Sequence, residues 1–378
     1  MEAATVTTAA LTPVTPVSDV VDPVALAAAV AAGHVRVQRH PDRALSIYNY
    51  TEACVYAGAW TPVTLTCRGL IVDDATGAVL ARPFPKFFNH DQIGAPALRL
   101  DAKVTVTDKA DGSLGIVYPD GDGFAVATRG SFASTQARHA TQLLRTRYAG
   151  FAPPPGLTVL VEVIFPANRI VLDYGDLDDL VLLGAVDIAT GRTHGPDAVP
   201  DWPGPAVERF RYATLADALA APARGNREGL VVHFPDTDER VKIKYAEYVR
   251  LHRLVTGLNA RVVWELMVAG AHGDPGVGDP GGLAAFIEPL PDEFHPWVHG
   301  VVAELTETVE ARTATIESAY REIVAALPDG WTRRDFAQHA VAHPDRGCLF
   351  LRLDGKDYRP LLWQQVRPAA DRTPHLVE

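Results

Sequence analysis

The chain has 378 residues, of which 47% are hydrophobic and 21% are charged, and its formal net charge is −11. This length allows two domains with at least one sizeable core, and the negative charge argues against a protein that coats nucleic acid without selectivity. Residues 1–21 have neither a basic start nor a continuous apolar stretch, and no apolar run is long enough to span a bilayer. The composition therefore predicts a soluble protein without a signal peptide or a membrane partner.

The three cysteines, Cys54, Cys67 and Cys348, are widely separated along the chain. Their odd number and their spacing fit neither a disulfide framework nor a zinc site. We therefore expect free thiols in a reducing compartment, which places the protein in the cytoplasm.

The first part of the chain predicts an antiparallel meander. A loose start and a short Ala-rich helix occupy residues 1–33. Residues 103–107 alternate at period two, and the segments 113–118 and 124–128 follow tight turns rich in Asp and Gly. Three short strands joined by such turns are typical of neighbouring antiparallel strands.

A helix and further strands are expected up to residue 244. Ser134 is a suitable N-cap for a helix that runs to about residue 148. The expected strands cover residues 157–165, 169–172, 180–188, 229–234 and 240–244.

After residue 244 the periodicity becomes helical. Helices are expected at residues 245–256, 260–269 and 298–327, with a Gly/Pro-rich loop at about 270–282 and a helix that Thr332 caps. The predicted fold class is α+β, with an antiparallel-sheet domain followed by a mainly helical C-terminal domain. The predicted division is an N-terminal extension (residues 1–33), a strand-rich domain (34–255) and a helical domain (256–378).

A lysine stands where one alternating run ends and another begins, in the segment Lys109-Ala110-Asp111-Gly112. This placement suits a lysine nucleophile with a carboxylate beside it, although Asp-Gly after a strand is also an ordinary hairpin turn. The segment resembles the nucleophile motif of the covalent nucleotidyltransferases, the superfamily of ATP-dependent ligases and capping enzymes.

Other motifs of that superfamily are matched in order along the chain. They are Thr128-Arg129-Gly130, residues 161–166 with Asn168-Arg169-Ile170-Val171, residues 228–232, and residues 241–245. Upstream, Cys67-Arg68-Gly69 and Pro85-Lys86-Phe87 resemble elements of the T4 RNA ligase 1-like branch. The resemblance covers about residues 68–245 and implies a nucleotidyltransferase (adenylation) domain.

The resemblance implies an ATP-dependent RNA ligase that acts through a lysyl-AMP intermediate and an adenylylated RNA 5′ end, with Mg²⁺ or Mn²⁺ as cofactor. The implied partners are ATP and RNA with 5′-phosphate and 3′-hydroxyl ends, broken tRNA among them. The implied catalytic residues are Lys109, Lys242 and Lys244. The implied nucleotide-binding residues are Arg68, Lys86, Asp111, Gly112, Arg129, Glu162 and Glu228, and a metal would be held by Glu228 and Asp111, directly or through water.

These residue types suit that chemistry on physical grounds. An attacking amine must be unprotonated, and cations gathered around it disfavour the protonated form. The same cations would neutralise a triphosphate. Lys242 and Lys244, two apart on a strand, would face one site, and Gly112 would permit the turn that presents the lysine.

Two departures leave alternatives open. Arg129 stands where a Lys is also usual, and the region after about residue 256 matches no substrate-binding motif. Residues 353–363 predict either a docking helix or, preferably, a capped C-terminal helix that packs on the core. The alternatives are a nucleotidyltransferase with another acceptor (a DNA end, a cap-type acceptor or a small molecule) and a non-catalytic nucleic-acid-binding relative. The sequence does not indicate an oligomeric state.

Overall fold

The computed structural model describes residues 14–92, 99–269, 280–288, 290 and 294–371. The chain divides into two compact units, residues 1–249 and 250–378. The division falls within helix α7 (Ala246–Gly257), a few residues before the predicted boundary. Among the described residues, no helix combines the length and the apolar character needed to cross a membrane.

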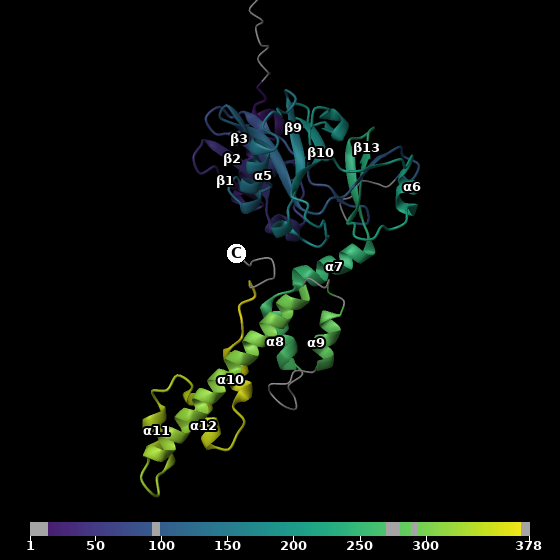
Figure 1. Cartoon of the computed structure of the whole chain (residues 1–378). Coiled ribbons are helices and arrows are strands. Elements are labelled where there is room, and N and C mark those ends of the chain that lie inside the picture. Colours follow the sequence, from purple (N-terminus) through teal and green to yellow (C-terminus); the bar gives the residue numbers. More distant parts are fainter. Residues whose placement is uncertain (1–13, 93–98, 270–279, 289, 291–293, 372–378) are drawn as a thin grey trace, which may run out of the picture. The chain divides into compact units, whose positions relative to one another are not determined.

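The first unit contains three sheets, and almost all of their strand pairs are antiparallel (Figure 1). Sheet A has the order β1-β2-β3-β4, sheet B the order β11-β10-β9-β7-β8, and sheet C the order β12-β6-β13-β14-β5. The strands of sheet A are β1 (Val35–Arg39), β2 (Leu45–Tyr50), β3 (Arg68–Asp73) and β4 (Val79–Ala81). The strands of sheet B are β7 (Ser113–Asp120), β8 (Gly123–Thr128), β9 (Leu157–Ile164), β10 (Asp179–Asp187) and β11 (Thr193–His194). The strands of sheet C are β5 (Phe88–Asn89), β6 (Thr105–Asp108), β12 (Arg209–Phe210), β13 (Gly229–Phe234) and β14 (Glu239–Lys244).

Short helices cover sheet A. They are α1 (Val17–Val20), α2 (Pro23–Ala31), α3 (Glu52–Ala57) and α4 (Pro62–Thr66). The Asp22 side chain caps α2 by accepting a hydrogen bond from the Ala25 amide at 2.7 Å. Leu26 of α2 packs on a buried cluster that includes Val35 and Val63. The described part of the predicted N-terminal extension is therefore built into the first unit.

Helix α5 (Thr135–Thr146) lies on sheet B (Figure 1). The Ser134 hydroxyl accepts a hydrogen bond from the Ala137 amide at 3.1 Å, which confirms the predicted cap. Leu143 and Leu144 of this helix join the core with strands β7 to β10. The opposite face of sheet B packs on the inner face of sheet A, where Ile47 and Ile71 are fully buried.

The predicted meander over residues 103–128 is wrong. Strand β6 pairs with β12 and β13 in sheet C, whereas β7 pairs with β8 and β9 in sheet B. Only β7 and β8 form the expected hairpin. The segment 109–112 is thus the passage of the chain from one sheet to another. Helix α6 (Leu215–Ala220) packs on sheet C.

The strand predicted at residues 169–172 is also wrong. This segment is irregular and follows a short 3₁₀ turn, Pro166–Asn168; a second such turn is Pro196–Ala198. The amides of Val171 and Leu172 donate to the Asp111 carboxylate, both at 3.1 Å, instead of to a neighbouring strand. A side chain therefore satisfies the backbone groups that a sheet would otherwise bind.

The second unit is helical, as predicted. Its helices after α7 are α8 (Ala260–Ala269), α9 (Pro280–Ile287), α10 (His295–Ala326), α11 (Arg333–Ala340), α12 (Arg346–Leu353) and α13 (Arg359–Gln365). Helix α9 begins within the predicted loop at 270–282, of which residues 270–279 lie outside the described residues. The Thr332 amide donates to Asp335 Oδ2 at 2.8 Å, which confirms the predicted start of α11.

The second unit has its own hydrophobic core. Ile316, Phe336 and Leu349 are completely buried in it. Leu362 and Trp363 of α13 belong to the same core, and the Trp264 indole donates to the Trp363 carbonyl at 2.9 Å. Residues 359–363 thus belong to a C-terminal helix that packs on the core, which is the preferred alternative, whereas residues 354–358 connect it to α12.

Candidate active site

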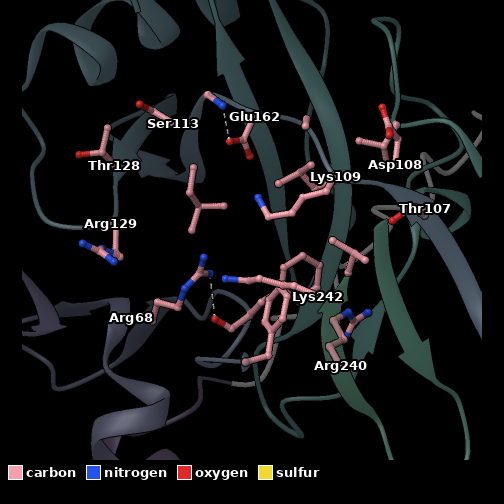
Figure 2. Close-up of a pocket in the computed structure, with 18 of the residues that line it drawn as sticks. Arg68, Thr107, Asp108, Lys109, Ser113, Thr128, Arg129, Glu162, Arg240 and Lys242 are labelled. Atoms are coloured by element: carbon pink, nitrogen blue, oxygen red, sulfur yellow. Dashed lines mark hydrogen bonds between the residues drawn. The ribbon is translucent and has the colours of Figure 1, made fainter. Parts of the chain in front are cut away.

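A cavity of about 610 Å³ lies within the first unit and is lined by all three sheets. Figure 2 shows Lys109 and Lys242 extending into the same space, with Arg68 and Arg129 on one side of it and Arg240 on the other. The basic side chains in its lining are Arg36, Arg68, Lys109, Arg129, Arg240 and Lys242, whereas its acidic side chains are Asp108 and Glu162. This excess of positive charge suits a polyanionic ligand.

Lys109 lies on the passage from sheet C to sheet B and is paired with a buried carboxylate. Its Nζ is 2.6 Å from Glu228 Oε2, and Lys244 Nζ is 2.8 Å from the other oxygen, Oε1. Glu228 is only 2% exposed. The sequence predicted a lysine among cations, and the structure adds one carboxylate that is shared between two lysines.

Both the carboxylate and the backbone amide of Asp111 form hydrogen bonds within the protein. Besides the Val171 and Leu172 amides, its carboxylate accepts a hydrogen bond from the Tyr248 hydroxyl at 2.8 Å, and its own amide donates to the Tyr174 hydroxyl at the same distance. Burial raises the pKa of the Tyr248 hydroxyl well above its usual range. Asp111 therefore anchors the nucleophile segment, and its predicted contact with a nucleotide or metal stays a prediction.

Gly112 is needed for close packing and not for the turn that was expected at this position. Its backbone does not have a positive φ. A Cβ atom at this position would lie 2.6 Å from the Val163 carbonyl oxygen on β9. The Gly112 amide donates to Glu162 Oε1 at 3.0 Å. The missing side chain thus brings the segment that carries Lys109 against Glu162.

Glu162 contributes a buried carboxyl group to the cavity lining. Burial raises its pKa to about 7, and the charge of Lys109 opposes that rise. The group therefore changes its charge near neutral pH, and an added cation in the cavity would favour the carboxylate.

Lys242 and Lys244 lie on β14 with the same orientation but have different surroundings. Lys244 binds Glu228, as described, whereas Lys242 lines the cavity with its Nζ 4.7 Å from the Phe87 ring centroid. Burial, reinforced by the charges of Arg68 and Lys109, lowers the pKa of Lys242 to about 6. Lys242 is therefore a suitable binding partner for an entering anion.

Arg68 and Arg129 are held by neutral groups. Arg68 Nη1 donates to the Phe84 carbonyl at 3.3 Å, and Arg129 Nη1 donates to the Tyr50 hydroxyl at 2.9 Å. Burial lowers the pKa of Arg68. These interactions orient both guanidinium groups without neutralising their charge.

Lys86 does not line this cavity. It lines a smaller cavity of about 260 Å³, and its amine donates to the Phe87 carbonyl at 3.0 Å, with Nζ 4.1 Å from the Phe88 ring centroid. Burial first, and then the charges of Arg68 and Arg129, lower its pKa to about 8. A phosphate contact by Lys86 would need a different side-chain direction, so this role stays a prediction.

Among the polar residues of the lining, Arg36, Asn49 and Arg240 were not among the predicted site residues. Arg240 lies two residues before Lys242 on β14, so the argument applied to Lys242 and Lys244 could have been extended to it. Asn49 breaks the alternation of buried apolar residues that begins with Leu45 and Ile47. Arg36 carries no local signal.

The antiparallel sheets and the lysine-centred cationic cavity agree with the resemblance to the covalent nucleotidyltransferases that the sequence motifs indicate. Residues 66–211 match the family model described as RNA ligase. Within this stretch the chain is similar to the T4 RNA ligase 1-like family, in agreement with the resemblance of its sequence motifs.

Two curated relatives are similar to the chain. A proposed bifunctional polynucleotide kinase/RNA ligase of Autographa californica nuclear polyhedrosis virus is 25% identical over 325 residues, which are 78% of this chain and 45% of the relative. A proposed RNA ligase of Thermovibrio ammonificans is 30% identical over 217 residues, which are 53% of this chain and 56% of the relative. The chain thus spans about half the length of the curated relatives it matches.

Solved structures of a Naegleria gruberi RNA ligase are also similar in part. A structure with PPi is 21% identical to this chain and has a TM-score of 0.32. The match covers 40% of this chain and 52% of the Naegleria chain. The structure of a mutant with AMP and Mn is 20% identical and also has a TM-score of 0.32. Its match covers 41% of this chain and 53% of the Naegleria chain. At these scores the likeness carries no argument about this chain.

Proposed function

We propose that the chain is an ATP-dependent RNA ligase that joins a 5′-phosphate to a 3′-hydroxyl through a lysyl-AMP intermediate on Lys109. The observation that carries the proposal is the position of Lys109, between a buried carboxylate and a cavity lined by Lys242, Arg68 and Arg129. The match of residues 66–211 to the RNA ligase family supports it.

In the first step the Lys109 amine attacks the α-phosphorus of ATP. A nitrogen–phosphorus bond forms, and the bond from that phosphorus to the pyrophosphate oxygen breaks. The amine leaves Glu228 to do so, but Lys244 remains on the other oxygen, 2.8 Å away. The buried carboxylate is therefore not left without a cation, which would be strongly unfavourable.

The cationic side chains of the cavity stabilise the negative charge that develops on the phosphates. Lys242 is placed for the α-phosphate, because it lines the same cavity as Lys109 and has a pKa lowered to about 6. Arg68 and Arg129 bind the remaining phosphates or the ribose, and Glu162 accepts from ribose hydroxyls. Lys244 acts through Glu228 in this proposal.

Two further transfers complete the ligation. An oxygen of the RNA 5′-phosphate attacks the AMP phosphorus, and the nitrogen–phosphorus bond to Lys109 breaks. The 3′-hydroxyl of the other end then attacks the activated 5′-phosphate and releases AMP. We propose RNA ends as acceptors, broken tRNA among them, and a cytoplasmic location; the described cysteines Cys54, Cys67 and Cys348 are free and buried.

A divalent cation fits this site only together with the nucleotide. Within the described part of the chain, no group of three or more acidic, His or Cys side chains could hold a metal ion. Mg²⁺ is commonly held by one or two carboxylates plus substrate phosphates. Glu228, as predicted, and Glu162, whose charges influence each other, would supply these carboxylates. The ion would offset phosphate charge.

Labelling with ATP that carries the label on its α-phosphate tests the proposal. We expect an acid-labile adduct on the protein in the presence of Mg²⁺, its loss in Lys109→Ala, and its discharge by 5′-phosphorylated RNA. Lys103→Ala is a matched control, since Lys103 is exposed and lies outside the cavity lining. No adduct in the wild type would contradict the enzyme proposal. An adduct that RNA does not discharge would indicate another acceptor, and preferential labelling by GTP would indicate cap-type chemistry.

A further inference from the structure

Two loops hold the nucleophile segment, residues 108–112, from its two ends. The first loop covers residues 221–228 and connects α6 to β13. The second loop covers residues 165–178 and connects β9 to β10. Both loops contact the segment through polar groups, so their conformation sets its position.

The first loop holds the start of the segment through an ion pair. Arg224 Nη2 donates to Asp108 Oδ1, and Arg227 Nε lies 3.6 Å from Asp108 Oδ2. Figure 2 shows the Asp108 carboxylate pointing away from the Lys109 amine, so this pairing fixes the backbone and leaves the amine free to face the cavity. Arg224 is itself fixed, since its guanidinium carbon lies 4.3 Å from the Phe210 ring centroid.

The same loop ends at Glu228, whose carboxylate is shared by Lys109 and Lys244. Only three residues of the sequence lie between Arg224 and Glu228. A shift of this short stretch would move the Glu228 carboxylate relative to Lys109 and would move Asp108 at the same time. The conformation of residues 224–228 therefore determines the direction of the Lys109 amine.

The second loop holds the end of the segment. The amides of Val171 and Leu172 donate to the Asp111 carboxylate, and the Asp111 amide donates to the Tyr174 hydroxyl. Asp111 is only 5% exposed. A buried carboxylate depends on such donors, because a buried charge without partners is strongly unfavourable. The position of Asp111 therefore follows that of the second loop.

Asn226 joins the two loops to each other. Its Oδ1 accepts a hydrogen bond from the Asp173 amide at 3.0 Å, and its Nδ2 donates to the Asp173 carbonyl at 2.6 Å. One side chain thus binds both backbone groups of one residue, as the backbone of a paired strand does. Asp173 lies between Leu172 and Tyr174, the residues that hold Asp111.

The backbone of Asn226 lies in the left-handed region, with a φ of +51°. This conformation is uncommon outside glycine, although asparagine tolerates it better than most residues. Asn226 and Asp173 are both exposed, so neither contributes to a hydrophobic core. An uncommon conformation at an exposed position beside the candidate active site points to a role in that site.

We propose that Asn226 is a positioning residue for Lys109: by tying the two loops together, it fixes the acidic side chains that orient the Lys109 amine toward the α-phosphorus. The inference rests on the proposed ligase function and adds a residue to it. Asn226 lies outside the cavity lining, so it acts on the rate of attack and not on the binding of ATP. The rate is sensitive to such positioning, since a misplacement of about 1 Å can lower it about a hundredfold.

The test uses Asn226→Gly in the full chain. Glycine adopts a positive φ without strain, so this substitution removes the two side-chain hydrogen bonds and leaves the backbone conformation accessible. Gly225→Ala is the matched control in the same loop, because a Cβ there meets no atom within 4 Å and the backbone does not have a positive φ. Denaturant titration should show that both variants are folded, since both positions are exposed.

Two reactions are measured for each variant. Single-turnover self-adenylylation at varied ATP gives a maximal rate constant and a half-saturating ATP concentration. Sealing of RNA whose 5′ end is already adenylylated does not use Lys109 as a nucleophile. In Asn226→Gly the maximal rate constant should fall about tenfold, whereas the half-saturating concentration and the sealing rate should stay within about twofold of the wild type. Gly225→Ala should match the wild type in all three values.

Arg224→Gln provides a second test, because it releases the other contact of the same loop. It should lower the same maximal rate constant. In the double variant with Asn226→Gly, the loss should be smaller than the product of the two single losses, since both residues act through the position of one loop. Losses that multiply would show that the two residues act independently, against the proposal.

A wild-type maximal rate constant in Asn226→Gly would overturn the positioning role. An increase in the half-saturating ATP concentration alone would do the same, because it would indicate a role in binding. An equal loss in self-adenylylation and in sealing would indicate general damage to the fold and would also contradict the proposal. Failure of the proposed function is a separate result, because the wild type itself would then form no adduct.

Discussion

At the scale of single residues, burial prepares Lys242 to receive an anion. Its pKa is lowered to about 6 by burial and by neighbouring cations, so the amine is mostly neutral at pH 7.5 in the protein alone. A phosphate beside it would favour the protonated form and raise the pKa. Binding of a polyanion should therefore take up a proton, and affinity should decrease as the pH rises above about 6.

This uptake can be measured by titrating the protein with ATP, without metal, in two buffers of different ionisation enthalpy. At pH 7.5 we expect the observed binding enthalpy to differ between the buffers by an amount equal to about one proton taken up. Lys242→Gln should abolish the part of the difference that is due to this amine, Glu162→Gln the part that is due to the carboxyl group whose pKa is raised to about 7, and Lys103→Ala should retain both. Lys86, whose pKa is lowered to about 8, should add to the uptake mainly at higher pH. Equal enthalpies in both buffers for the wild type would contradict the assignment of Lys242.

The surroundings of the buried Glu228 carboxylate could be predicted from the sequence only in part. The sequence order of the motifs was sufficient to bring Lys109, Glu228 and Lys244 together, because their resemblance to a known set was specific. It did not predict that both lysines share one carboxylate, at 2.6 and 2.8 Å. Such pairings depend on side-chain directions that are set by packing between distant segments.

At the scale of elements, local periodicity predicted strands well but not their partners. Residues 105–108 and 113–120 are strands near the predicted positions, yet they belong to different sheets. An alternating pattern reports that one face is buried, and it is equally compatible with several neighbours. The partners of β6 are β12 and β13, both of which lie more than a hundred residues later in the chain. The same limit explains the irregular segment at 169–172, whose backbone binds Asp111.

The passage between sheets B and C depends on contact between Gly112 and β9. In Gly112→Ala the new Cβ would lie 2.6 Å from the Val163 carbonyl, so the segment that carries Lys109 would have to move away from Glu162. We expect a loss of about 1–3 kcal/mol in the free energy of unfolding, together with slower self-adenylylation. Denaturant titration and adduct formation measure the two effects.

Gly123→Ala on β8 is the matched control for this substitution. Its Cβ would meet no atom within 4 Å, and its φ is not positive. The free energy of unfolding should change by less than about 0.5 kcal/mol. A Gly112→Ala protein as stable and active as the control would show that close packing on β9 is not required.

At the scale of the whole molecule, the two units have separate cores. Buried residues from Val255 to Trp363 form the core of the second unit, whereas the clusters of the first unit include Ile47 of sheet A and Leu230 of sheet C. Separate cores allow each unit to unfold as its own cooperative step. The candidate active site lies within the first unit. Binding of ATP should therefore stabilise this unit against unfolding and should not stabilise the second unit.

Calorimetric unfolding of the full chain should therefore show two transitions. ATP at one hundred times its dissociation constant should stabilise the first unit by about 2.7 kcal/mol and leave the other transition unchanged. Phe336→Ala removes a completely buried ring of the second core, and should destabilise only the transition that ATP does not shift, by about 3–5 kcal/mol. Leu230→Ala, at a position 1% exposed on β13, should destabilise only the ATP-sensitive transition. If either substitution shifted both transitions equally, the two units would unfold as one, and the separate cores would not define separate cooperative steps.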